Sequence, residues 1–211
     1  MEKYLTLMVS FVKRQYYPHL LLTLLFVAAS GGFVSFKGLE EQQAARVMEM
    51  YAAFAGILLF TPLFMPEQDR EIWNLERSKA LPGWKLYLLR FLPALSVCIL
   101  TILLFVALME KGGSEFDAGI LFRGSYCEIL FLGSIGFFAS AVTNQVVIGY
   151  MAAVVCYAMN IGGAKYWGRF ALFQMMQGEY GSWTYWLVGA VVLFVSGVFI
   201  REEMAGGMSN K

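Results

Sequence analysis

Residues 91–109 read FLPALSVCILTILLFVALM and contain no charged side chain. A helix of about 20 apolar residues is long enough to cross the hydrocarbon core of a bilayer. Further stretches of the same character lead us to predict six membrane spans, at residues 18–36, 47–65, 91–109, 125–142, 146–163 and 183–200. The predicted fold is all-α, a polytopic membrane protein with six transmembrane helices.

The composition of the whole chain agrees with this prediction. Of the 211 residues, 59% are hydrophobic and 15% are charged, whereas about 25% are charged in an average soluble domain. Only Glu49 and Glu128 place a charge inside a predicted span, as expected when burying one charge in lipid costs about 2.5–3.5 kcal/mol. The net charge of +1 argues against a nucleic-acid partner, which requires a basic surface. The expected surroundings are a lipid bilayer.

Lys and Arg residues indicate the orientation, because they concentrate in the cytoplasmic segments of membrane proteins. With the N-terminus inside, the cytoplasmic segments hold ten of the 16 basic residues and the external segments hold six. An even number of spans then returns the chain to the same side. We therefore predict that both termini are cytoplasmic.

Two segments outside the spans have a helical pattern of their own. Residues 1–17 carry apolar side chains at helical spacing, which predicts an amphipathic helix in the membrane interface ahead of a six-helix domain at residues 18–211; the alternative is an ordinary polar lead-in. In residues 66–90, Pro66 followed by acidic residues is typical of a helix start, and Pro82-Gly83 of a stop. We predict a short charged helix at the cytoplasmic surface; the alternative is a solvated loop.

The remaining connections are predicted from length and composition. Residues 143–145 are a tight cytoplasmic turn, and residues 164–182 contain an apolar stretch bracketed by aromatic residues, which predicts a helix dipping into the outer leaflet. Glycines inside the spans, such as Gly133 and Gly136, allow helices to pack closely.

The sequence shows no combination of nucleophile and base, no phosphate-binding loop and no metal-ligand spacing. We therefore expect a protein that is not an enzyme and that holds no cofactor or metal itself. Four polar residues near or inside spans remain as candidates for function: Glu49, Arg123, Glu128 and Asn160. One interpretation is structural, with Glu128 paired to Arg123 or Arg46; the other is a role facing a substrate.

The layout resembles the ABC-2 type permeases, the membrane subunits of ATP-binding-cassette exporters. The local resemblance lies in the acidic run Pro66–Glu71, the step Ser78–Lys85 that contains Pro82-Gly83, and the basic lead Tyr87–Arg90 into the third span. The order of an N-terminal amphipathic helix, six spans, a charged segment after span two and a partly embedded segment before span six is similar as well.

This resemblance implies that the charged segment is a coupling helix that docks on a separate ATPase. The residues that it assigns to docking are Glu67, Asp69, Arg70, Glu71, Trp73, Asn74, Glu76 and Arg77. It further implies two ATPase copies that bind ATP and Mg, a second permease chain, identical or homologous, and a place in the cytoplasmic membrane of a bacterium. The cargo would be an amphiphilic peptide, drug or lipid-like compound. The alternatives are a small channel or membrane scaffold outside this family and, third, an intramembrane enzyme.

Overall fold

The computed structural model describes residues 8–68, 83–168 and 171–209. These residues form helices and irregular connections and contain no strand. Six helices in this part of the chain are long and apolar enough to cross a membrane: Met8–Phe33, Glu41–Gln68, Trp84–Lys111, Ala118–Thr143, Val146–Gly163 and Trp183–Met204. The predicted all-α class is confirmed, and each predicted span falls on one of these helices.

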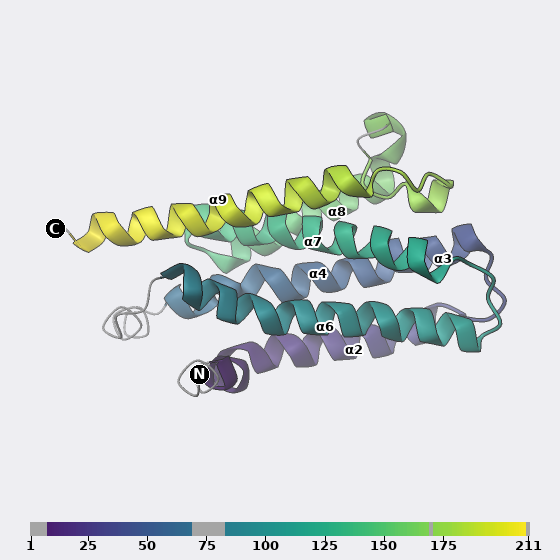
Figure 1. The fold of residues 1–211 in the computed structure, drawn as a ribbon, viewed down its shortest axis with the longest axis horizontal. Helices are drawn as coiled ribbons and strands as arrows, with labels where there is room; N and C mark the ends of the chain where they lie inside the picture. Colours follow the sequence, from purple (N-terminus) through teal and green to yellow (C-terminus); the bar gives the residue numbers. More distant parts are fainter. Residues whose placement is uncertain (1–7, 69–82, 169–170, 210–211) are drawn as a thin grey trace.

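The helices lie side by side along the long axis of the molecule, with both chain ends at the same end of the bundle (Figure 1). We call this the terminal end, and the other the opposite end. In chain order the elements are η1 (Val12–Tyr16), α2 (Tyr17–Phe33), α3 (Glu41–Val47), η2 (Met48–Ala52), α4 (Ala53–Phe60), η3 (Thr61–Gln68), α6 (Gly83–Lys111), α7 (Ala118–Thr143), α8 (Val146–Trp167), η5 (Met175–Gln177) and α9 (Trp183–Ser209).

The centre of the bundle is built by α7 and by the second helix, Glu41–Gln68. Helix α7 packs against α4, α8 and α9. The apolar stretch of the second helix is 83% buried, whereas that of α9 is 11% buried and exposes side chains such as Val188 and Val195. Outer helices with apolar exposed faces are what a lipid environment requires.

Close contact between α7 and the second helix depends on glycines, as predicted. A Cβ atom on Gly133 would lie 2.5 Å from Cδ2 of Phe60, and one on Gly136 would lie 2.1 Å from Oγ1 of Thr61. No real side chain tolerates such distances, so both positions require glycine for this packing. The hydrogen atom in place of a side chain lets the two helix backbones approach each other.

The second helix changes its winding along its length. It opens with α3, widens into the π-helical turn η2, continues as α4 and tightens into the 3₁₀ helix η3 at the terminal end. Glu49 lies in η2 and Glu67 lies near the end of η3. Single π-helical turns occur often at functional sites, and the two buried acidic side chains of this helix, Glu49 and Glu67, lie where the regular α-helix is interrupted.

The helices extend beyond several of the predicted span boundaries. Residues 8–17 are helical and run without a break into α2, so the interfacial position predicted for residues 1–17 stays a prediction. Pro66 and Glu67 belong to η3, the end of the second helix, and do not begin a new one. Trp84 to Arg90 form the first turns of α6. The rest of the predicted coupling helix lies outside the described residues.

The two predicted connections have different outcomes. The tight turn is confirmed while its cytoplasmic position stays a prediction, and the external helix is wrong. The turn from α7 to α8 consists of Asn144, in the left-handed conformation with φ of 56°, and Gln145. The external helix predicted within 164–182 is absent from residues 171–182, which are irregular apart from the short 3₁₀ turn η5. The buried positions Ala171 to Met175 pass into the protein. Irregular backbone at this depth is tolerated because protein groups satisfy its hydrogen bonds.

Candidate functional site

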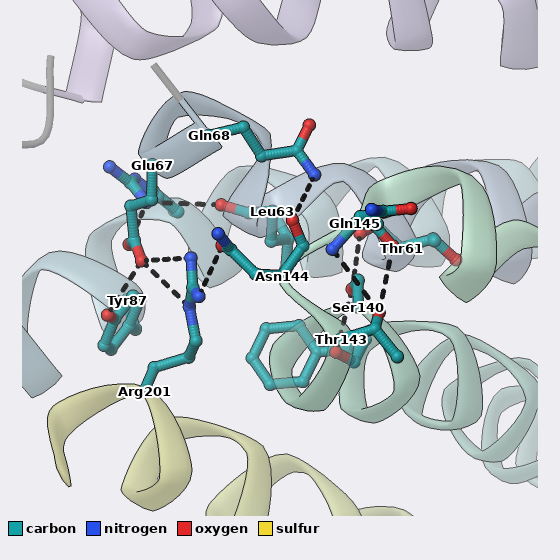
Figure 2. Close-up of polar contacts among 12 residues, drawn as sticks. Thr61, Leu63, Glu67, Gln68, Tyr87, Ser140, Thr143, Asn144, Gln145 and Arg201 are labelled. Atoms are coloured by element: carbon teal, nitrogen blue, oxygen red, sulfur yellow. Dashed lines mark hydrogen bonds and ion pairs between the residues drawn. The ribbon is translucent and has the colours of Figure 1, made fainter. Parts of the chain in front are cut away.

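The first candidate site is a buried charged cluster at the terminal end, which we call the Glu67 cluster. It consists of Glu67 from η3, Tyr87 and Arg90 from α6, Asn144 from the α7–α8 turn and Arg201 from α9. Figure 2 shows Arg201 reaching from α9 toward the Glu67 carboxylate and the Asn144 side chain. Side chains from four separate parts of the chain therefore meet in one place.

Glu67 accepts hydrogen bonds from three side chains of two other helices. Arg90 Nη1 lies 2.8 Å from Oε1, and Tyr87 Oη donates to Oε2 over 3.2 Å. Arg201 places Nη2 3.1 Å and Nε 3.2 Å from the same Oε2 atom. Glu67, Arg90 and Arg201 are 6%, 2% and 3% exposed. Removing one partner from such a buried ion pair costs about 3–5 kcal/mol, because a charge is left uncompensated.

The cluster also reaches the α7–α8 turn. Arg201 Nη1 donates to Oδ1 of Asn144 over 2.6 Å, and Gln68 Nε2 donates to the Asn144 backbone carbonyl over 3.1 Å. Aromatic rings cover the guanidinium groups: Arg90 lies 5.4 Å from the Phe11 ring centre and Arg201 5.2 Å from that of Phe64. Cations over ring faces gain further electrostatic stabilisation.

Both sides of the 69–82 segment are anchored in this cluster or next to it. Gln68 and Glu67 precede the segment, and Tyr87 and Arg90 follow it on the first turns of α6. The backbone N–H of Trp84 donates to Glu202 of α9 over 2.7 Å. The two chain stretches that flank the segment are thus tied to each other and to α9.

The docking residues predicted for this segment divide into two groups. The first group is Glu67 alone, whose carboxylate faces Arg90 and Arg201 inside the bundle. The second group lies outside the described residues: Asp69, Arg70, Glu71, Trp73, Asn74, Glu76 and Arg77. Docking stays a prediction for both groups.

The second candidate site lies toward the opposite end, where Glu49 of η2 meets Glu128 of α7. The two side chains are 0% and 3% exposed, and their carboxyl groups lie beside each other. Glu49 Oε1 accepts from the backbone N–H of Met175 over 2.7 Å, and Oε2 accepts from that of Met176 over 3.0 Å. Glu49 thereby satisfies two backbone donors at the start of η5, which have no helical partner of their own.

Asn160 of α8 holds the same irregular segment from another side. Its Oδ1 atom accepts from the Leu172 backbone N–H over 2.8 Å, and its Nδ2 group donates to the Cys156 carbonyl over 2.9 Å. Asn160 and Glu49, which the sequence singled out separately, act on residues three to four positions apart. Together they accept the backbone N–H groups of Leu172, Met175 and Met176 in segment 171–177.

The arginine pairing predicted for Glu128 is not observed. Arg123 is exposed and lies over the Trp183 ring at 4.7 Å from its centre, and Arg46 is also exposed. Among the described residues no ion pair joins either arginine to Glu128. The neighbour of Glu128 is a second carboxyl group. The sequence analysis selected Glu49 and Glu128 separately and did not predict that they meet. The available signal for their contact was that both lie near the same predicted membrane boundary.

Within the described ranges, no three or more His, Cys, Asp and Glu side chains are grouped so as to hold a metal ion. The three cysteines, Cys98, Cys127 and Cys156, are free thiols, and the first two are buried. Comparisons with protein-family models, with curated proteins and with solved structures found no significant match.

Proposed function

We propose that this chain is the permease subunit of an ABC exporter, which forms the substrate pathway as a dimer and is driven by separate ATPase subunits. The observation that carries the proposal is the Glu67 cluster. It ties the residues on both sides of the 69–82 segment to α9 and to the α7–α8 turn through buried ion pairs. A segment that only reversed the chain would not need such an anchor.

The cluster suits the transmission of force from a docked partner. Ion pairs and bidentate contacts hold η3, α6 and α9 in a fixed arrangement at the terminal end. A displacement of the 69–82 segment by closing ATPases would move these three helices as a unit, as in rigid-body switching. In this scheme Glu67 is the joint between the docking segment and the spans, and the charged residues from Asp69 to Arg77 make the contact.

The remaining parts of the proposal follow from this scheme. The terminal end faces the cytoplasm of a bacterium, where two ATPase copies bind ATP and Mg. A second permease chain, identical or homologous, completes the pathway. The apolar exposed faces of the outer helices α2, α6, α8 and α9 suit a cargo that partitions into lipid, so we propose an amphiphilic peptide, drug or lipid-like compound as the exported substrate.

Native purification tests the proposal directly. The tagged chain is extracted from bacterial membranes, and its subunits and bound ligand are identified by mass spectrometry. We expect an ABC ATPase in stoichiometric amount, and we expect Asp69→Arg combined with Arg70→Asp to remove it while the chain still inserts in the membrane. The matched control is Glu110→Lys, an exposed charge at the opposite end.

Two outcomes contradict the proposal. Unchanged recovery of the ATPase with the charge-reversed chain would refute the docking segment. Recovery of the unmodified chain without any ATPase, in mild detergent or native lipid particles, would favour a small channel or membrane scaffold.

A further inference from the structure

The neighbouring carboxyl groups of Glu49 and Glu128 limit the number of protons that the pair can lose. Both oxygens of Glu49 accept backbone N–H groups, from Met175 and Met176. The carboxyl group of Glu128 lies beside the same carboxyl group, with both side chains buried. Two ionised carboxylates are acceptors only and repel each other away from water, so a hydrogen bond between these neighbours requires at least one proton.

The hydrogen-bond donors indicate where this proton lies. Glu49 receives two backbone N–H donors, which stabilise a negative charge. Glu128 is 3% exposed, and no backbone or arginine donor reaches it among the described residues. With one proton on the pair, the arrangement that these donors favour is an ionised Glu49 that accepts a hydrogen bond from a neutral Glu128.

A second observation concerns two polar atoms at this site. Glu128 Oε2 and Ser125 Oγ are buried and have no hydrogen-bond partner in the structure. Ser125 is 1% exposed and lies one turn before Glu128 on the same face of α7. These atoms are too few for a hard metal cation, which takes six or more oxygen ligands.

We propose that Glu128, Glu49 and Ser125 form a binding site for one exchangeable proton, and that the bound proton keeps residues 171–177 seated in the protein. Release of this proton leaves two negative charges in contact and away from water, which the buried site cannot stabilise. The irregular segment then loosens, because Glu49 is its anchor to the second helix. This inference does not depend on an ATPase partner.

Other titratable groups lie on the elements around the pair, so the experiment must separate their titration from that of the pair. They are Glu41 and Arg46 on α3, Cys98 on α6, Cys127 on α7, Tyr157 on α8 and Tyr180 after η5. Arg46 attracts the charge of Glu49. Burial and the nearby Glu41 carboxylate raise the pKa of Tyr180 above its usual range, so this phenol titrates at a higher pH than a free one.

The test is hydrogen exchange of the protein in lipid nanodiscs, read by mass spectrometry at residues 171–177 as a function of pH. Rates are divided by the intrinsic exchange rate at each pH. We expect a protected segment at low pH and, above the titration of the pair, a loss of protection of about tenfold per pH unit, the slope for release of one proton. Glu128→Gln keeps a donor to Glu49 without a titrating proton, so we expect protection that does not depend on pH.

The control variant is Glu110→Gln, which removes an exposed carboxylate near the same end of the bundle and is expected to keep the wild-type profile. A second measurement needs no variant: infrared spectroscopy of the wild type follows the C=O stretch of the protonated carboxyl group. We expect this band at neutral pH, and we expect it to disappear over the same pH range in which segment 171–177 loses protection.

Three results would overturn the inference. One is a Glu128→Gln protein with the pH dependence of the wild type. Another is a wild type without a protonated carboxyl band at neutral pH. The third is restoration of protection at high pH by added sodium ions, which would identify a cation site in place of a proton site.

Discussion

The two ends of the bundle neutralise a buried acid of the second helix in different ways. At the terminal end, Glu67 is surrounded by Arg90, Arg201 and Tyr87 from other helices. Toward the opposite end, Glu49 is surrounded by two backbone N–H groups and a second carboxyl group. The first arrangement joins helices to one another, and the second joins an irregular segment to the helices.

The two arrangements suit different tasks. Compensation of Glu67 by two guanidinium groups makes the Glu67 cluster a rigid connection between helices. The site of Glu49 and Glu128 depends on one proton, and two buried atoms there, Glu128 Oε2 and Ser125 Oγ, have no hydrogen-bond partner. The first site suits transmission of movement, and the second suits a response to a small ligand.

The largest expected effect is at the Glu67 cluster. Glu67→Ala leaves two buried guanidinium groups without their carboxylate, and we expect the free energy of unfolding to fall by about 3–5 kcal/mol. Denaturant unfolding in detergent micelles measures this change, with Glu110→Ala as the exposed control. If Glu67→Ala lowers the free energy of unfolding no more than Glu110→Ala does, the ion pairs of the Glu67 cluster do not stabilise the terminal end as stated.

The next largest effect is local and concerns Glu49. Glu49→Ala removes the acceptor for the Met175 and Met176 N–H groups, and a hydrogen bond to a charged group contributes about 1.5–3 kcal/mol. We expect faster hydrogen exchange in residues 171–177, with the exchange of η3 and the start of α6 unchanged. Equal acceleration at both ends would show that the two sites are not independent.

Asn160 tests whether the segment has a second anchor. Asn160→Ala leaves the buried Leu172 N–H without its acceptor, which costs about 1–3 kcal/mol. We expect local exchange near Leu172 to increase at every pH, unlike the pH-dependent opening assigned to Glu128. The comparison variant is Asn144→Gly, which removes the Arg201 contact but tolerates the left-handed backbone; its effect is expected at the terminal end.

The smallest effect is expected at Arg123, which lies exposed over the Trp183 ring. An exposed contact of this kind contributes about 0.5–1 kcal/mol, so Arg123→Gln is expected to lower unfolding stability by no more than that. The pH dependence of segment 171–177 is expected to stay as in the wild type. A shifted pH profile would mean that Arg123 acts on Glu128 after all.

Much of the fold could be predicted from local sequence. Long uncharged runs such as residues 91–109 predicted the spans, because lipid excludes charge, and the short 143–145 stretch left room only for a turn. The irregular course of residues 171–177 could not be predicted, because its apolar residues also fit a helix. What decides against a helix is the supply of partners for its backbone by Glu49 and Asn160, which come from other helices.

Composition over about 20 residues at a time is enough to predict the helical class, the six helices long and apolar enough to span a membrane and the rarity of charge within them. Which polar side chains meet depends instead on how helices far apart in the sequence pack. Glu67 reaches Arg201 across 134 positions and Glu49 reaches Met175 across 126. Close packing of α7 on the second helix, made possible by Gly133 and Gly136, accompanies the contact between Glu49 and Glu128. The charge state of a buried acid depends on such neighbours in space, and a local sequence pattern does not specify these neighbours.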